Sequence, residues 1–108
     1  MALLDDLKVG ILKAASGALS GKPQVVVNYL KVEGEKLALT LSMIADGVAN
    51  KTITQEEAVI LLNQQKVAAT SVLTASVGMS IVTAQKAVND VLAAVRDIVN
   101  SKLPFPLL

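Results

Sequence analysis

The stretch from Ala58 to Gln85 runs for 28 residues with a single charged side chain, Lys66, and without a proline. Most of its residues are alanine, valine, leucine, serine and threonine. A helix on the surface of a globular protein normally carries charged residues along its solvent-facing side. Because this stretch carries almost none, it must be covered by other helices, by a second copy of the chain or by lipid.

Apolar residues recur at intervals of three and four along the chain, which is the spacing of amphipathic helices. This spacing predicts a first helix over about residues 2–20, with two aspartates in its first turn that favour the helix dipole. A second helix is predicted over about residues 23–49, starting at Pro23, where a proline costs no helical hydrogen bond. We therefore expect an all-α fold in a single domain of 108 residues.

The predicted second helix carries two apolar stripes that lie beside each other. One is a heptad seam, and the other is interrupted by Lys36. The seam consists of Val27, Leu30, Gly34, Leu37, Leu41, Ile44 and Val48, and the second stripe of Val25, Tyr29, Val32, Leu39 and Met43. One neighbouring helix could not cover both stripes, so this helix should make contacts on more than one side.

A third helix is predicted from residue 55 to about residue 100, with Thr54 and Glu57 at the spacing of a capping box. Gly78 is its only weak point, because the surrounding sequence lacks proline, asparagine and aspartate. We favour one long helix of about 70 Å that pairs with the first two helices in an antiparallel bundle of three. The alternative is a compact four-helix bundle with a break near Gly78, which agrees better with common helix lengths.

The last seven residues, 102–108, are apolar and contain two prolines, so they cannot continue the third helix. Free in water, this tail would expose Phe105 and two leucines. We expect Phe105 and the terminal leucines, Leu107 included, to dock in a groove of their own bundle or of a neighbour.

The sequence lacks the residues on which most enzyme sites depend. Without histidine and cysteine, the usual nucleophile–base pairs and the metal sites of helical bundles have no members. The ten basic residues are scattered and only two residues are aromatic, so nothing favours nucleic-acid binding. We expect no enzymatic activity, no cofactor and no nucleic-acid partner.

One inter-helix segment, residues 46–57, resembles the twelve-residue calcium loop of EF-hand proteins. The matching positions are 1, 5, 7 and 12 of that loop, which here are Asp46, Asn50, Thr52 and Glu57. Val48 stands where a ligand is needed and Lys51 where the turn needs glycine. A capped turn explains the same residues without a metal, so we predict no metal and retain these four as the only calcium candidates.

We interpret the chain as a non-enzymatic protein that self-associates, as a subunit of an oligomer or a structural assembly. The wide apolar arc, the charge-free stretch and the tail together offer more apolar surface than a three-helix monomer can readily bury, and large exposed patches mark interfaces. The residues expected at the interface are Gly34, Leu37, Leu41, Ile44, Val72, Val77, Gly78, Ile81, Phe105 and Leu107.

Two other functions remain as alternatives. One is a membrane-active protein that inserts the uncharged residues 67–85, although seven of these nineteen carry hydroxyl or amide groups. The other is an adaptor whose groove accepts a partner's helix. The N-terminus has acidic residues where a signal peptide needs basic ones, so a cytoplasmic location is expected, with signal-independent export left open.

Overall fold

Five helices are formed by the part of the chain that the computed structural model describes, residues 2–18 and 21–108. They are α1 (Ala2–Ala18), α2 (Gln24–Ala49), α3 (Gln55–Val77), α4 (Ile81–Ala93) and α5 (Arg96–Ser101). The described residues contain no strand, which confirms the predicted all-α class. The end of the first helix predicted at residue 20 lies outside the described residues.

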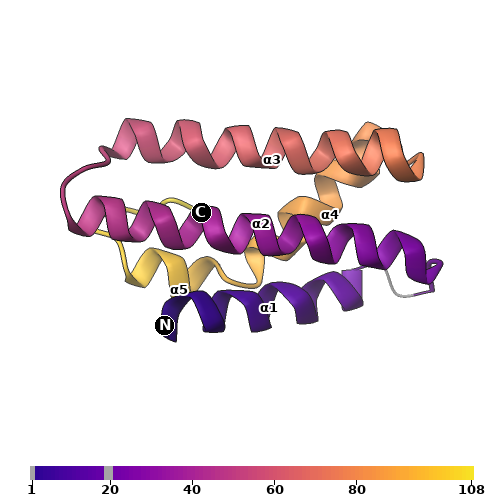
Figure 1. The fold of residues 1–108 in the computed structure, drawn as a ribbon, viewed down its shortest axis with the longest axis horizontal. Helices are drawn as coiled ribbons and strands as arrows, with labels where there is room; N and C mark the ends of the chain where they lie inside the picture. Colours follow the sequence, from indigo (N-terminus) through magenta and orange to yellow (C-terminus); the bar gives the residue numbers. More distant parts are fainter. Residues whose placement is uncertain (1, 19–20) are drawn as a thin grey trace.

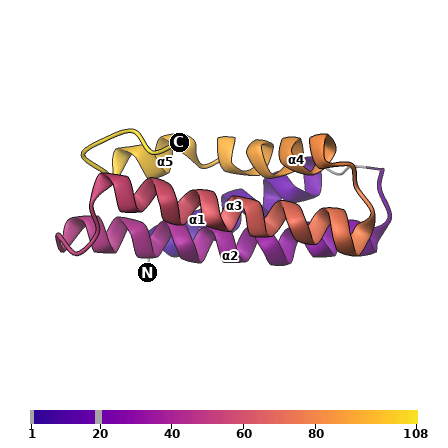
Figure 2. The same ribbon diagram turned by 90° about the horizontal axis from the view of Figure 1, so that it is seen from above.

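The four longer helices form a ring in which neighbouring helices pack against each other, and α2 and α4 also touch across it. α2 lies between α1 and α3, and α4 contacts both α1 and α3. In Figure 1, α1, α2 and α3 lie side by side with α4 behind them, and Figure 2 shows α4 and α5 end to end along one side. The bundle measures 41 × 24 × 17 Å.

The chain reverses direction at Gly78, between α3 and α4. Gly78 has a φ of 72°, in the left-handed region that glycine adopts without a steric penalty. The N–H groups of Gly78 and Met79 both donate to the carbonyl oxygen of Leu73. The Ser80 hydroxyl then accepts the N–H of Thr83 at 3.1 Å and caps the start of α4.

The favoured prediction of one continuous helix over residues 55–100 is therefore wrong, and the structure follows the alternative with a break near Gly78. A second interruption separates α4 from α5 at residues 94–95. The physical reason is that one left-handed glycine and one serine cap supply all that a tight reversal needs. Proline, asparagine and aspartate are common at such turns, but they are not required.

The turn between α2 and α3 has the predicted capping box. The hydroxyl oxygen of Thr54 accepts the N–H of Glu57 at 3.2 Å, and the Glu57 carboxylate accepts the N–H of Thr54 at 3.0 Å. Ile53 packs over Gly47 so closely that a Cβ on Gly47 would lie 2.5 Å from the Cγ1 atom of Ile53. This turn therefore fixes α2 and α3 as an antiparallel pair.

The core is aliphatic, and the heptad seam of α2 is the side that faces it. Gly34 lets α1 approach α2 closely, because a Cβ there would lie 2.5 Å from the Cγ2 atom of Ile11. The largest fully buried side chains are Leu7, Ile11, Leu30, Leu37, Leu41, Ile44, Leu73, Val88, Val91 and Val95. Since the seam occupies the inner side of α2, the second stripe is directed outward.

Candidate functional site

The second apolar stripe of α2 lies on the surface of the molecule. We call it the outer stripe; its members are Val25, Tyr29, Val32, Leu39 and Met43. Their exposed fractions range from 38 % for Tyr29 to 68 % for Met43. Single exposed apolar residues are common on proteins, but five large ones aligned on one helix are not.

Helical geometry places the outer stripe on the side of α2 opposite the core. Successive residues turn by about 100°, so the stripe lies roughly half a turn away from Gly34, which faces α1. From Val25 to Met43 the stripe extends for about 27 Å. None of the other helices described here covers this length of α2.

Lys36 interrupts the outer stripe near its middle, but an ion pair draws its charge to one edge. The Lys36 ammonium lies 3.0 Å from the carboxylate of Glu33. The Glu33 side chain is only 3 % exposed, whereas that of Lys36 is 54 % exposed. The aliphatic stem of Lys36 can therefore continue the apolar surface while the ammonium stabilises a buried carboxylate.

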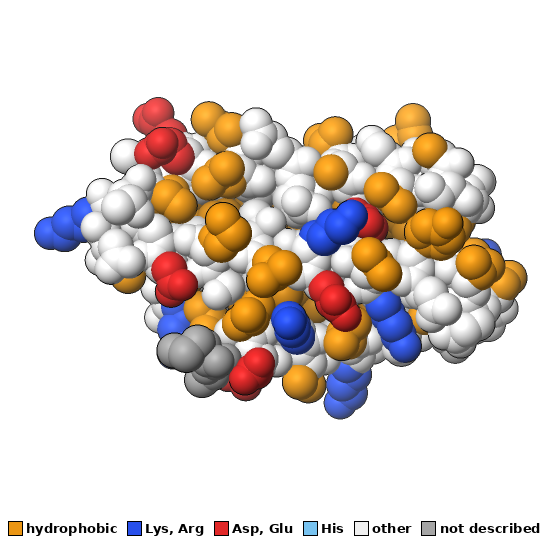
Figure 3. All heavy atoms as spheres, in the orientation of Figure 1, with side chains coloured by type: hydrophobic (Ala, Val, Ile, Leu, Met, Phe, Trp, Pro, Cys, Tyr) orange, Lys and Arg blue, Asp and Glu red, His pale blue; other side chains and the backbone are white. Residues whose placement is uncertain are grey.

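The apolar surface continues from α2 onto α3. A hollow of 220 Å³ lies between the two helices, next to Met43 at the C-terminal end of the outer stripe. It is lined by Thr40, Met43, Ile44, Ile53, Leu61, Gln64 and Gln65. Figure 3 shows this face, with hydrophobic side chains spread over α2 and α3 and several charged ones toward α1.

A groove of 530 Å³ runs between α3 and α4. Six of its ten lining residues carry amide or hydroxyl groups, Lys66 adds an ammonium, and the remaining three are apolar. The lining residues are Asn63, Lys66, Val67, Thr70, Ser71, Thr74, Ile81, Gln85, Val88 and Asn89. The charge-free stretch is therefore only partly buried, because its hydroxyl-rich side faces this groove.

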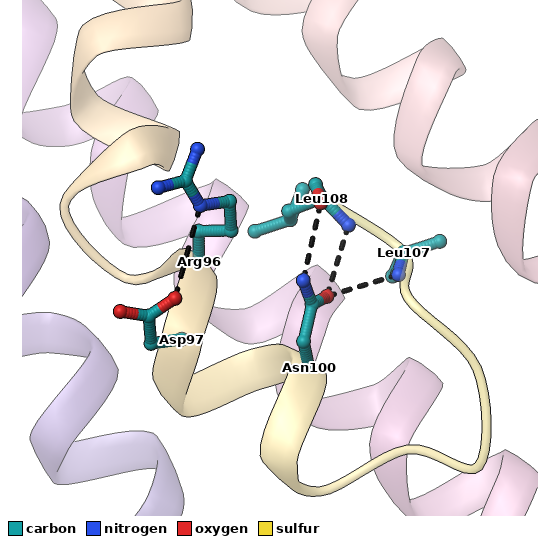
Figure 4. Close-up of polar contacts among 5 residues, drawn as sticks. All are labelled: Arg96, Asp97, Asn100, Leu107 and Leu108. Carbon is teal, nitrogen blue, oxygen red and sulfur yellow. Dashed lines mark hydrogen bonds and ion pairs between the residues drawn. The ribbon is translucent and has the colours of Figure 1, made fainter.

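The tail folds back onto its own bundle. The side chain of Asn100 accepts the N–H groups of Leu107 and Leu108 and donates to the carbonyl oxygen of Leu108, as Figure 4 shows. Phe105, Leu107 and Leu108 are partly buried against the core. Of the two docking sites expected for the tail, the structure has the one within the same chain.

The predicted interface residues fall into two groups. Four are buried inside the chain and are covered by its own helices: Gly34, Leu37, Leu41 and Ile44. The other six are partly buried or exposed: Val72, Val77, Gly78, Ile81, Phe105 and Leu107. The spacing of apolar residues in the sequence predicted both stripes of α2. Because both stripes are apolar, the spacing did not show which of them would face solvent.

Two of the four calcium candidates, Thr52 and Glu57, have other side-chain partners in the structure. The Thr52 hydroxyl donates to the carbonyl oxygen of Gly47, and the Glu57 carboxylate is used in the capping box. Asp46 lies in the last turn of α2, and Asn50 follows that helix as its C-cap. Across residues 2–18 and 21–108, no three His, Cys, Asp or Glu side chains are grouped to hold a metal ion.

The uncharged residues 67–85 do not form one helix, because the reversal at Gly78 divides them between α3 and α4. In the described part of the chain, no helix combines the length and the apolar character needed to cross a membrane.

The sequence matches no protein-family model, and comparisons with curated proteins and with solved structures gave no significant match.

Proposed function

We propose that this protein is a non-enzymatic helical subunit that associates with copies of itself, and that the outer stripe of α2 is the contact surface. The observation that carries this proposal is the alignment of five large, exposed apolar side chains along one side of α2. Apolar residues at alternating intervals of three and four form the contact seam of paired helices. Counting Lys36 between Val32 and Leu39, the outer stripe has this spacing on the side of α2 that its own bundle leaves open.

Association would stabilise a pair of copies by removing apolar area from water. Full burial of a Val, Leu or Met side chain contributes about 1.5–3 kcal/mol, so burying the exposed half of each contributes about 1 kcal/mol. The stripe supplies five such side chains per copy, and the exposed Leu61 beside the hollow extends the surface onto α3. A second copy offers the same surface, so both members of a pair would bury apolar area.

The experiment compares the native mass of the protein with that of a charged variant, using sedimentation velocity or light scattering over a series of concentrations. Leu39 and Met43 are exposed, so Leu39→Lys and Met43→Lys should leave the fold intact while placing charge in the stripe. Each should shift the protein from oligomer to monomer. Ser16→Lys, on the exposed side of α1, is the matched control and should keep the mass of the unaltered protein.

A protein that is monomeric throughout the micromolar to millimolar range contradicts the proposal. So does an oligomer whose mass is unchanged by both lysine substitutions, because its contact surface must then lie elsewhere. Circular dichroism checks that each variant keeps the helical content of the original chain.

A further inference from the structure

We infer that one end of the bundle docks onto an anionic lipid surface. This end, which we call the basic end, is formed by the start of α2 and by the turn between α3 and α4. Two independent features carry the inference. The segments that meet there contain lysines and no acidic residue, and exposed apolar side chains form the tip. The contact is separate from self-association along the outer stripe.

The charges of the chain are separated along the bundle. Residues 7–32 and 58–89 contain six of the ten basic residues and none of the nine acidic ones. α1 and α3 run toward the basic end and α2 and α4 begin at it, so the two segments surround this end together (Figure 1, Figure 2). On the face in Figure 3, the acidic side chains lie over the left and the middle, and the right-hand tip is apolar. The six basic residues are Lys8, Lys13, Lys22, Lys31, Lys66 and Lys86.

Exposed apolar side chains form the tip of the basic end. Val25 is the second residue of α2, and Ile81 and Val82 are the first two residues of α4. Their exposed fractions are 58, 63 and 75 %, and Val82 has the highest value among the large apolar residues described. The Cα–Cβ bonds of a helix tilt toward its N-terminus. Because α2 and α4 both begin here, these side chains lean outward past the end of the bundle.

Lysines lie one step behind this tip. Lys31 is seven residues into α2 and Lys86 is five residues into α4, which corresponds to about 10 Å and about 8 Å along the axis. Apolar groups of peripheral proteins enter a bilayer by about 5–10 Å below the headgroups. When the tip is buried to this depth, both ammonium groups therefore lie at the level of the lipid phosphates. Their long side chains let them stay in contact with water.

Acidic residues stay clear of the lipid in this orientation. The first acids on the two helices that begin at the basic end are Glu33 and Asp90, each nine residues in, or about 14 Å along the axis. Each is already paired, Glu33 with Lys36 at 3.0 Å and Asp90 with Lys86 at 2.7 Å. A bilayer offers both an apolar interior for the tip and negative phosphates for the lysines, which is why it fits this end.

Vesicle co-sedimentation of the full chain tests the inference. Vesicles of phosphatidylcholine mixed with phosphatidylserine supply the anionic surface, and vesicles of phosphatidylcholine alone supply the neutral one. A lysine near an anionic surface strengthens binding about fivefold, so the mixed vesicles should bind the protein more tightly by at least about tenfold. Added salt should weaken this binding, because it screens the charges.

Two matched pairs of variants locate the contact. Ile81→Glu places a carboxylate at the tip and should weaken binding by at least about tenfold. Ile60→Glu makes the same change near the start of α3, at the opposite end and at a similar exposed fraction of 56 %, and should bind like the unaltered chain. In the same way, Lys22→Gln just before α2 should weaken binding about fivefold, whereas Lys51→Gln just after it should not.

Each outcome separates the inference from the proposed function. Loss of binding with Ile81→Glu and Lys22→Gln, but not with their controls, supports docking through the basic end. Absence of binding to the mixed vesicles overturns the inference and leaves self-association standing, because native mass is measured without lipid. Equal losses for Ile81→Glu and Ile60→Glu overturn it as well, because net charge then explains the binding. So does a lower native mass of Ile81→Glu without lipid, because the basic end then contacts another copy.

Discussion

Asn100 and Leu108 are joined by two hydrogen bonds that run in opposite directions. The side-chain oxygen of Asn100 accepts the N–H of Leu108 at 3.0 Å, and its side-chain nitrogen donates to the carbonyl oxygen of Leu108 at 3.1 Å. The same oxygen accepts the N–H of Leu107 at 2.9 Å. One asparagine therefore satisfies both N–H groups of the last two residues, which lie in no helix.

Replacing Asn100 by alanine should release the tail. Three hydrogen bonds at a part-buried site are lost, so Asn100→Ala should lower the free energy of unfolding by about 1–3 kcal/mol. Urea denaturation measures this, and faster amide exchange at Leu107 and Leu108 shows where the loss occurs. Asn28→Ala is the control, because Asn28 bonds only an exposed side chain and should change stability by less than about 0.5 kcal/mol. Equal effects of the two substitutions would contradict the role of Asn100.

Replacing Gly34 by alanine should destabilise the bundle, although alanine is the better helix former. The added Cβ would lie 2.5 Å from the Cγ2 atom of Ile11, so α1 and α2 must separate. Overpacking of this kind costs about 1–3 kcal/mol, against about 1 kcal/mol gained from helix propensity. Gly17→Ala, in a helix with open space around it, should instead be neutral or stabilising. Chemical denaturation gives both values, and a stabilising Gly34→Ala would show that α1 and α2 are not in close contact.

The reversal between α3 and α4 should depend on the handedness of Gly78. Alanine disfavours its φ of 72° by about 1–2 kcal/mol, so Gly78→Ala should lower the melting temperature. Asparagine tolerates this region better, so Gly78→Asn should recover part of the loss. Thermal unfolding followed by circular dichroism compares them. If alanine and asparagine behave alike, backbone strain does not explain the turn.

Removing the Lys36 ammonium, whose partner carboxylate is buried, should lower the free energy of unfolding more than removing a lysine whose partner is exposed. Lys36→Met leaves the buried Glu33 carboxylate without its partner, which we expect to cost about 1–3 kcal/mol. The combined variant Glu33→Gln with Lys36→Met should recover much of that stability. Lys86→Met breaks a pair whose side chains are 75 % and 48 % exposed, and should cost less than about 0.5 kcal/mol. Chemical denaturation measures the free energy of unfolding of each variant, in the Leu39→Lys background so that changes in association do not contribute. Equal losses of stability for Lys36→Met and Lys86→Met would show that burial of the partner carboxylate has no effect.

Local patterns in the sequence predicted the parts of this fold that local physics determines. The capping box of Thr54 and Glu57 and the start of α2 next to Pro23 both depend on residues within one helical turn of each other. The seam of α2 was also visible as a periodic pattern. These features could be recognised without knowledge of any tertiary contact.

Features that depend on packing could not be derived in the same way. A glycine inside an apolar helix is compatible with continuation, so the break at Gly78 was only an alternative until the contacts of α4 with α1 and α3 were known. Both stripes of α2 are apolar, and only the close approach of Ile11 to Gly34 shows which one faces inward. The residues predicted for an interface from the sequence therefore include Leu37, which the structure buries within its own bundle.

The ring of helices has a consequence for how the chain folds. Three of its four sides join consecutive helices and can form as local hairpins, whereas the contact of α1 with α4 joins the two ends of the series. Loop-closure entropy grows only slowly with loop length, so this one distant closure adds little to the folding barrier. A bundle dominated by neighbours in sequence has a low contact order, and folding within microseconds to milliseconds is expected.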